Sequence, residues 1–343
     1  MCRATNFRLI ISLLFILLSA CNRQDQPVGQ LVEQRILQFG TIIDVTLIHA
    51  ERNKAETALT QIEGQLLVYR KNWHAWEDGD LYRFNQTLLD TNKATVPESL
   101  KQLLVLSQQY YQQSQYLFNP ALGQLIDAYG FHGKSEPNGP LIRLIKTNIP
   151  TMLDLKINQQ TAHSHNPHLQ LDLGGIAKGY AIGLIANYLS NSGFEHFLIN
   201  AGGDLYASGN KFGQPWKIGI QNPFESGAIA SVSLMGNQSL FTSGNYQRFY
   251  KKAKKIVHHI IDPRTGNPSK NISSATVLSP DPVLSDVAAT TLMIDGIKNH
   301  RSLAETLGVK DYLIVSEDKK IIITRSFAQK INFTSDWPVT IVE

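Results

Sequence analysis

Cysteine is almost absent from this chain of 343 residues, which contains only Cys2 and Cys21. The globular part of the chain therefore has no disulfide framework, no cysteine-based zinc site and no cysteine nucleophile. A large excess of positive charge is also missing. Removing Arg3 and Arg8 from the 32 basic residues leaves 30 from Cys21 onward, against 28 acidic ones, a net charge of +2. A nucleic-acid-binding domain normally has a stronger basic patch, so we predict no nucleic-acid partner.

The apolar run near the N-terminus is too short to span a membrane. Leu9–Leu18 has about ten residues, against about twenty for a spanning helix. Basic residues precede this run and small residues follow it, which is the pattern of a secretory signal. The segment Leu18-Ser19-Ala20-Cys21 resembles a bacterial lipobox, in which cleavage precedes the cysteine and lipid is attached to it. An ordinary signal or a buried helix with a chance cysteine is the alternative.

This N-terminal pattern predicts three segments and a location. Residues 1–20 are expected to be a lipoprotein signal peptide, and residues 21–30 a polar tether that starts at lipidated Cys21. The mature chain would then be exported and lipid-anchored at the periplasmic face of the cell membrane. Asn22 stands where an aspartate would favour retention in the inner membrane. We favour the inner membrane, although this position leaves the outer one open.

The rest of the chain mixes helices and strands without regular alternation, which favours an α+β fold. Alternating residues around Phe39-Gly40-Thr41 predict a hairpin, and Thr95–Glu98 has the spacing of a capping box. A helix from about Asn53 is expected to bury Ala55, Leu59, Ile62, Leu66 and Leu67. Further along we expect a strand at 169–173, a helix at 176–189, a strand at 196–200, and helices near 285–295 and 298–307. A lobe boundary is placed near residues 136–150.

A glycine turn separates a strand from a helix at Asp172–Tyr180, which reads Asp-Leu-Gly-Gly-Ile-Ala-Lys-Gly-Tyr. Glycines let backbone amides approach a phosphate, and a helix N-terminus favours negative charge. Lys178 would add a positive point charge. Tight packing of strand against helix explains the same glycines, and the sequence matches neither a Walker loop nor a dinucleotide fingerprint. The glycine-rich segment Asn200–Asp204 is read mainly as a tight turn.

Two other segments carry groups that suit phosphate chemistry. Asp286 and Thr290 are four residues apart, so on a helix they share a face, and their oxygens suit Mg²⁺. A helix acid and a core threonine would give the same spacing. His259 precedes the turn signature Asp262-Pro263-Arg264-Thr265-Gly266. It could carry a proton near neutral pH, or it could be a structural histidine.

Together these segments resemble one family, the bacterial flavin-transferring lipoproteins. These are the FAD:protein FMN transferases of the ApbE family, formerly called thiamine-biosynthesis lipoproteins. Eight segments occur in the family's order between Phe39 and Gly296, behind the lipobox. They are Phe39–Thr41, Phe84-Asn85, Asn119–Gly123 with Tyr129–Phe131, Asp172–Tyr180, Asn200–Asp204, Thr242–Tyr246, His259–Gly266 and Asp286–Thr290. No single segment is specific, but eight in order are.

The resemblance implies a T-fold-like α+β architecture over residues 31–343, with mixed helices and sheets in two lobes around an FAD cleft. In this family a threonine hydroxyl of a target flavoprotein subunit attacks the riboflavin-side phosphorus of FAD. FMN becomes ester-linked to the threonine and AMP leaves, with Mg²⁺ on the pyrophosphate. Carried over position by position, the metal ligands are the Gly175 carbonyl, Asp286 and Thr290. FAD contacts are Phe39, Asp172, Lys178 and Ile261, and the catalytic residues are His259 and Asp286.

One stretch departs from the family pattern. Many members have a serine- and tyrosine-containing stretch before Phe84-Asn85, where this chain has Trp73-His74-Ala75-Trp76. Trp76 or Trp73 could stack on the isoalloxazine ring, and we assign this contact to Trp76; two buried core tryptophans are the alternative. The same stretch differs between members that transfer FMN and members that hydrolyse FAD. An FAD pyrophosphatase and a non-catalytic flavin-binding lipoprotein therefore remain alternatives to the transferase.

Overall fold

The computed structural model describes residues 29–132, 136–252 and 255–343. The predicted signal peptide and the lipidation site Cys21 lie outside these ranges. Within them, no helix combines the length and the apolar character needed to cross a bilayer.

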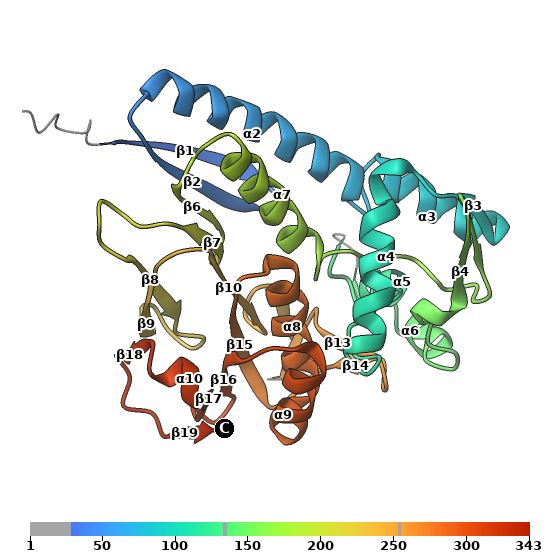
Figure 1. Ribbon diagram of the computed structural model, residues 1–343. Coiled ribbons are helices and arrows are strands. Elements are labelled where there is room, and N and C mark those ends of the chain that lie inside the picture. The colour runs from blue at the N-terminus through green and yellow to red at the C-terminus, as the bar shows by residue number, and fades with distance from the viewer. Residues whose placement is uncertain (1–28, 133–135, 253–254) are drawn as a thin grey trace, which may run out of the picture.

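A nine-stranded sheet forms the centre of the molecule (Figure 1). Its order is β1-β2-β6-β7-β10-β15-β16-β17-β19, antiparallel except for the last pair. The strand bounds are β1 Gln30–Gln38, β2 Thr41–His49, β6 His196–Ala201, β7 Asp204–Ser208, β10 Gln238–Gly244, β15 Ile272–Ser279, β16 Asp311–Ser316, β17 Ile321–Thr324 and β19 Val339–Val342. Neighbouring residues on a strand point to opposite faces, so the sheet has two apolar faces to cover.

Helices cover one face of the sheet (Figure 1). They are α2 (Arg52–Trp73), α7 (Ala177–Asn191), α8 (Pro282–Ile294) and α9 (Gly296–Leu307). Phe241 and Ile314 belong to the core cluster on this side, whereas their neighbours Leu240 and Leu313 belong to the cluster on the other side. That second face packs against a three-stranded sheet of β8 (Trp216–Gln221), β9 (Ala228–Leu234) and β18 (Ile331–Phe333), and α10 (Arg325–Ala328) lies beside it.

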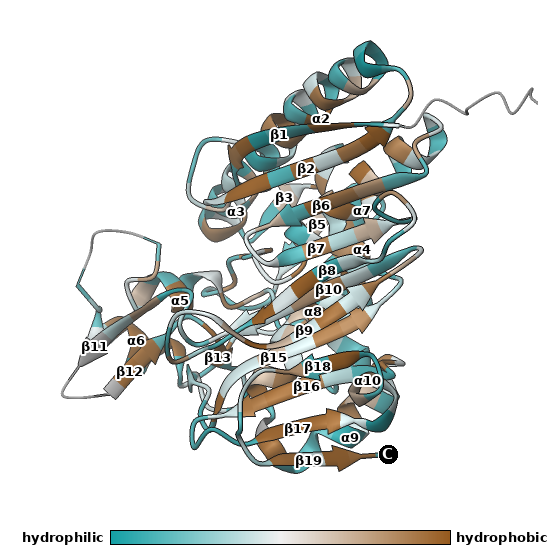
Figure 2. Cartoon of the chain, turned by 90° about the vertical axis from the view of Figure 1, so that its left-hand side faces the viewer, coloured by the Kyte–Doolittle hydropathy of each residue, from teal (hydrophilic) through white to brown (hydrophobic). Residues whose placement is uncertain are grey.

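A smaller, mainly helical part lies beside the end of the central sheet (Figure 1). It holds α3 (Asp80–Thr91), α4 (Glu98–Gln113), α5 (Gly123–Ala128), α6 (Gly139–Ile145) and the 3-10 turn η1 (Met152–Asp154), with a small sheet of β3 (Lys93–Thr95), β4 (Leu155–Asn158) and β5 (Thr161–Ser164). Two hairpins adjoin α5 and α6: β11 (Phe249–Lys252) with β12 (Lys255–His258), and β13 (Ile261–Asp262) with β14 (Asn267–Pro268). Figure 2 shows the first hairpin projecting from the body next to these helices.

The mixed composition confirms the α+β prediction, and most elements lie where the sequence placed them. The hairpin at Phe39-Gly40 forms with positive φ at both residues, 54° and 69°, as a type I′ turn requires. Three predictions are wrong in detail. Thr95 pairs in β3 and Pro97 is the N-cap of α4 (Glu98–Gln113), so Thr95–Glu98 is no capping box. Leu67 is 56% exposed and is not on the buried face of α2. Residues 169–173 form no strand but an extended segment with one isolated bridge, Leu122 to Gln170.

Candidate functional site

Two adjoining pockets form a cleft where the helical part meets the central sheet. Seven of the predicted site residues line the first pocket, and two more line the second. The pockets share Asp172, Gly174, Lys178 and Arg248, so they form one continuous cleft. The residues of the first are Asp172, Gly175, Lys178, His259, Ile261, Asp286 and Thr290; those of the second are Phe39 and Trp76. The fold therefore brings together residues that are far apart in the sequence.

The close crossing of α7 and α8 buries Asp286. Its side chain is 4% exposed, and its Oδ2 accepts a hydrogen bond of 2.8 Å from the backbone N–H of Gly179 on α7. Burial and the nearby Asp204 raise the pKa of Asp286 to about 7, although Lys178 and the Gly179 amide oppose this shift. Near neutral pH the carboxyl group thus lacks sufficient compensating positive charge, which a bound cation would supply.

The glycine turn before α7 leaves a backbone carbonyl without a donor. The N–H of Gly179, the third residue of α7, is one of the first N–H groups that a helix cannot pair internally. Here that N–H donates to Asp286, and within the described ranges the Gly175 carbonyl accepts no backbone hydrogen bond. Carbonyl oxygens left without a donor are suitable ligands for hard cations.

Thr290 completes a set of oxygen atoms at this crossing. A Cβ built on Gly175 would lie 3.5 Å from its Oγ1, so the two residues are adjacent. Oγ1 also lies 3.0 Å from Oγ of Ser243 on β10. No cluster of three or more His, Cys, Asp or Glu side chains suited to a metal occurs among the described residues. A metal here would be held by one carboxylate, one hydroxyl and one carbonyl, a donor set that suits Mg²⁺ and leaves positions for phosphate.

Gly179 is the residue that permits this crossing. A Cβ there would lie 2.4 Å from the Pro282 carbonyl oxygen and 2.8 Å from Cβ of Asp286. We predict that Gly179→Ala separates α7 from α8, lowers the free energy of unfolding by about 1–3 kcal/mol and weakens metal-dependent activity. Gly64→Ala in α2 is the control, because its Cβ would meet no atom within 4 Å. Thermal unfolding should show the control slightly stabilised, and equal melting temperatures for both variants would refute the prediction.

Lys178 lies between two buried carboxylates at the start of α7. Its ammonium forms an ion pair with Asp204, which is 3% exposed. Burial opposes the charge on Lys178, but Asp204 and Asp286 outweigh it and raise the lysine's pKa. Asp204 Oδ1 also accepts a hydrogen bond of 3.0 Å from the N–H of Thr242. Lys178 therefore stays protonated in the cleft and can offer its charge to an anion.

Asp172 lies on the shared wall of the two pockets as an ionised carboxylate. Its Oδ1 accepts a 2.8 Å hydrogen bond from the N–H of Gly174, and its Oδ2 lies 3.2 Å from Nε2 of His132. Burial alone would raise the pKa of Asp172, but His132 and the Gly174 amide lower it.

The two tryptophans of the second pocket differ in their surroundings. Trp73 is 7% exposed, stacks on Tyr69 at 4.6 Å and donates from Nε1 to the Ser99 carbonyl, so it is a core residue. Trp76 is half-buried and stacks on His132 at 3.4 Å, and its Nε1 has no hydrogen-bond partner among the residues that the structure describes. Phe39 packs against Trp73 at the pocket rim. Of the two tryptophans, only Trp73 has its Nε1 hydrogen-bonded to another described residue.

His259 lies on the wall of the first pocket in one defined tautomer. Its Nδ1 is 3.3 Å from the carbonyl oxygen of Arg248, a contact that requires a proton on Nδ1. The lone pair is then on Nε2. Burial, helped by the charges of Arg248 and His258, lowers the pKa of His259 to about 3. The imidazole is therefore neutral at physiological pH and can accept a proton at Nε2.

Sequence reasoning missed three side chains of the cleft. Arg248 lines both pockets and lowers the pKa values of His259 and Asp172. His132 covers one face of Trp76, and Ser243 contacts Thr290. Ser243 belongs to a segment, Thr242–Tyr246, whose polar residues beside glycine could have identified it. Arg248 and His132 stand in no recognisable motif, and the tertiary fold alone places them.

Comparisons with known proteins agree with this geometry. The model of the ApbE family matches residues 39–313. An FAD:protein FMN transferase of Rhodobacter capsulatus is 32% identical over 91% of this chain, which spans 61% of that protein. One from Klebsiella pneumoniae is 28% identical, with 91% of this chain and 93% of that protein covered. The crystal structure of the ApbE protein from Thermotoga maritima superposes with a TM-score of 0.79 at 24% identity, covering 88% of this chain and 99% of the other.

Proposed function

Because this chain belongs to the ApbE family, we propose that it transfers FMN from FAD to a hydroxyl group of a protein, and that the acceptor is a threonine of a flavoprotein subunit. The single observation that supports this reaction best is the cleft itself. Its first pocket holds the oxygen set around Asp286, the cationic Lys178 and the neutral His259. These are a cation site, an anion contact and a proton acceptor, the groups that phosphoryl transfer needs.

The proposed reaction is a displacement at phosphorus. The threonine oxygen forms a bond to the riboflavin-side phosphorus of FAD, and the bond from that phosphorus to the bridging oxygen breaks. AMP leaves with the bridging oxygen, and the threonine proton goes to Nε2 of His259. FAD phosphates near His259 would raise the pKa of this residue above its value in the free protein, because negative charge stabilises the imidazolium. Lys178 would hold a phosphate oxygen while this happens.

We propose Mg²⁺ as the metal, held by the Asp286 carboxylate, the Thr290 hydroxyl and the Gly175 carbonyl. The metal would neutralise charge on the phosphate oxygens of FAD. Two observations support this assignment. The pKa of the Asp286 carboxyl group is raised, and the Gly175 carbonyl accepts no backbone hydrogen bond within the described ranges. Phe39, Trp76 and Ile261 would contact FAD at the apolar walls of the cleft, where Trp76 Nε1 has no partner within residues 29–132, 136–252 and 255–343.

Two other functions use the same cleft and make different products. An FAD pyrophosphatase would release free FMN and AMP without an acceptor, and a flavin-binding lipoprotein would release neither. Incubating the protein with FAD, Mg²⁺ and a threonine-containing acceptor separates the three cases. Transfer predicts flavin bound covalently to the acceptor with equimolar AMP. AMP with free FMN would indicate the hydrolase, and bound FAD without AMP would indicate the binding protein.

We also propose that Cys21 carries lipid and that the protein is exported to the periplasmic face of the cell membrane. The lipobox-like segment before Cys21 supports this proposal. We predict that cells given labelled palmitate incorporate it into the wild-type chain and into Cys2→Ser, but not into Cys21→Ser. Cys2 is the matched control because it is the other cysteine of the chain and lies in the predicted signal. Equal labelling of the Cys21→Ser variant would contradict the anchor.

A further inference from the structure

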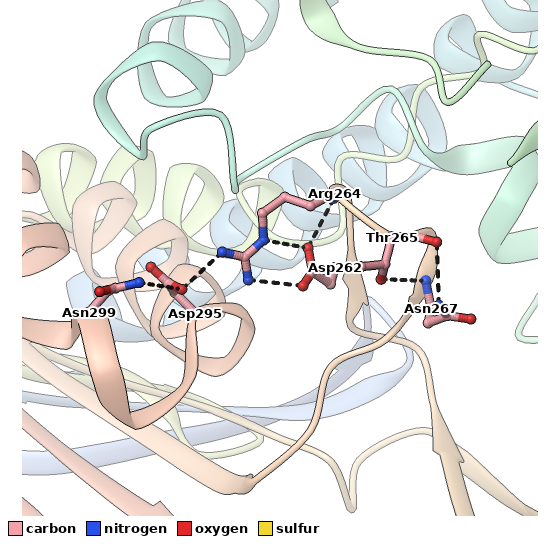
Figure 3. A network of polar contacts seen from close by, with 6 residues as sticks. All are labelled: Asp262, Arg264, Thr265, Asn267, Asp295 and Asn299. Atoms are coloured by element: carbon pink, nitrogen blue, oxygen red, sulfur yellow. Dashed lines mark hydrogen bonds and ion pairs between the residues drawn. The ribbon is translucent and has the colours of Figure 1, made fainter. Parts of the chain in front are cut away.

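Arg264 joins two carboxylates on different elements next to the cleft. Its Nε and Nη2 donate to the two oxygens of Asp262, each at 2.9 Å, and its Nη1 donates to Oδ1 of Asp295 at 3.0 Å. Figure 3 shows the guanidinium group between these two residues, with Asn299 on the far side of Asp295. Both carboxylates are largely buried, with side chains 15% and 8% exposed.

Asp295 is a nearly buried carboxylate that needs a partner. It is both the C-cap of α8 and the N-cap of α9, and its side chain caps no N–H of α9. The end of α8 disfavours an acid and the start of α9 favours one, so the helix dipoles do not decide the balance. A nearly buried acid loses its hydration, which makes an unpaired carboxylate costly. Arg264 supplies the compensating charge, and Asn299 adds one hydrogen bond of 3.2 Å.

The Arg264 bridge connects the strand next to His259 to the helix that bears the proposed metal ligands. Asp262 lies on β13, directly after Ile261, and Asp295 ends α8, whose residues Asp286, Thr290 and Ile294 line the cleft. Thr290 is five residues before Asp295, ~7.5 Å along the helix axis. Among the described residues, no other hydrogen bond or ion pair joins the β13–β14 hairpin to α8 or α9.

The hairpin is anchored independently to the helical part of the molecule. The Tyr129 hydroxyl donates to the Gly266 carbonyl at 2.8 Å, and Lys146 Nζ donates to Asn267 Oδ1 at 2.7 Å. These contacts hold β13–β14 against α5 and α6 and leave α8 untouched. Loss of Arg264 would therefore leave the hairpin in place and release the end of α8 from it.

We propose that Arg264 is a positioning residue that sets the distance between His259 and the oxygen ligands on α8. The inference rests on the proposed FMN transfer. Arg264 itself points into a neighbouring surface groove and not into the cleft, so it has no contact with the reacting groups. Its effect on the reaction would be transmitted through the corner between α8 and α9. Even a small displacement of the reacting groups lowers the rate strongly.

The test compares transfer kinetics and helix dynamics in Arg264→Gln and wild type. We expect kcat for transfer to fall about tenfold or more, with the Kd for FAD changed less than about twofold. In the metal-free variant, backbone amides of residues 291–295 should exchange hydrogen faster than in wild type. Arg264→Lys should recover only part of kcat, because an ammonium group cannot bind both oxygens of Asp262 while reaching Asp295.

Arg325→Gln is the matched control. Arg325 pairs with a single carboxylate, Glu343, and both side chains are exposed. Arg325→Gln should leave melting temperature and kcat near their wild-type values, because an exposed ion pair contributes little. A merely structural role for Arg264 predicts a lower melting temperature in Arg264→Gln with wild-type kcat, which would overturn the proposal. Wild-type kcat and unchanged exchange in Arg264→Gln would overturn the role of Arg264 alone. Absence of transfer by wild type would overturn the proposed function, while faster exchange in the variant would still support the Arg264 link between hairpin and helix.

Discussion

Replacing Asp286 with alanine is expected to abolish Mg²⁺-dependent transfer, with a loss of at least about 100-fold. The variant removes the only carboxylate of the proposed ligand set, and a metal ion at phosphate contributes several kcal/mol to the transition state. It also leaves the Gly179 amide and the Lys178 charge without this partner. The measurement is transfer rate against Mg²⁺ concentration. Asp318→Ala is the control, because Asp318 is an exposed carboxylate paired with Lys320 on the surface.

The pH dependence of metal activation checks the same residue independently. Burial and Asp204 raise the pKa of Asp286 to about 7, so below that pH Mg²⁺ must displace a proton from this group. We expect the Mg²⁺ concentration for half-maximal activity to increase as the pH falls through about 7. Metal-dependent activity that survives in Asp286→Ala, or a metal requirement independent of pH, would show that the ion binds elsewhere.

Replacing His259 with alanine is expected to lower kcat for transfer by about 10²–10⁴-fold, the usual contribution of a general base. FAD binding should change little, because the imidazole is neutral and contacts a backbone carbonyl of its own chain. The two quantities are measured separately, by single-turnover transfer and by quenching of FAD fluorescence. Activity of the wild type should decrease toward acid pH, since only the neutral imidazole accepts a proton.

His163→Ala is the control for this experiment, because His163 lies on β5 in the small sheet of the helical part. It should retain wild-type transfer. Equal losses of FAD affinity and of transfer in His259→Ala would identify His259 as a structural residue. A small loss of kcat with intact folding would mean that another group, or water, receives the proton.

The sequence predicted the turns and helices whose form depends on neighbouring residues along the chain. The type I′ turn at Phe39-Gly40 and the helices around Asp286 follow from glycine, apolar spacing and turn residues. Thr95–Glu98 failed as a capping box because Thr95 pairs in β3 and Pro97 occupies the N-cap. The prediction for Leu67 is wrong because only a narrow stripe of α2 is buried. Helical spacing alone does not show how wide that stripe is.

The cleft was predictable only where its residues lie in motifs. Asp172, Gly175, Lys178, His259, Asp286 and Thr290 stand in short segments with recognisable chemistry, and the fold places them on one pocket wall. His132 contacts Asp172 far along the chain, and the Arg248 carbonyl contacts His259, 11 residues away. The sequence predicted a tight turn at Asn200–Asp204, and Gly202 and Gly203 do form one. The buried ion pair of Asp204 with Lys178 was not predicted, because it depends on where α7 packs.

The central claim is FMN transfer from FAD to a protein hydroxyl, and intact mass spectrometry of an acceptor tests it most directly. An exported flavoprotein subunit with candidate threonines is incubated with this protein, FAD and Mg²⁺, beside reactions that contain Asp286→Ala or a chelator. We predict that the acceptor gains one FMN less water at a threonine, in the complete reaction only, with one AMP released per flavin attached. An acceptor whose mass stays unchanged while FAD is consumed would contradict the account.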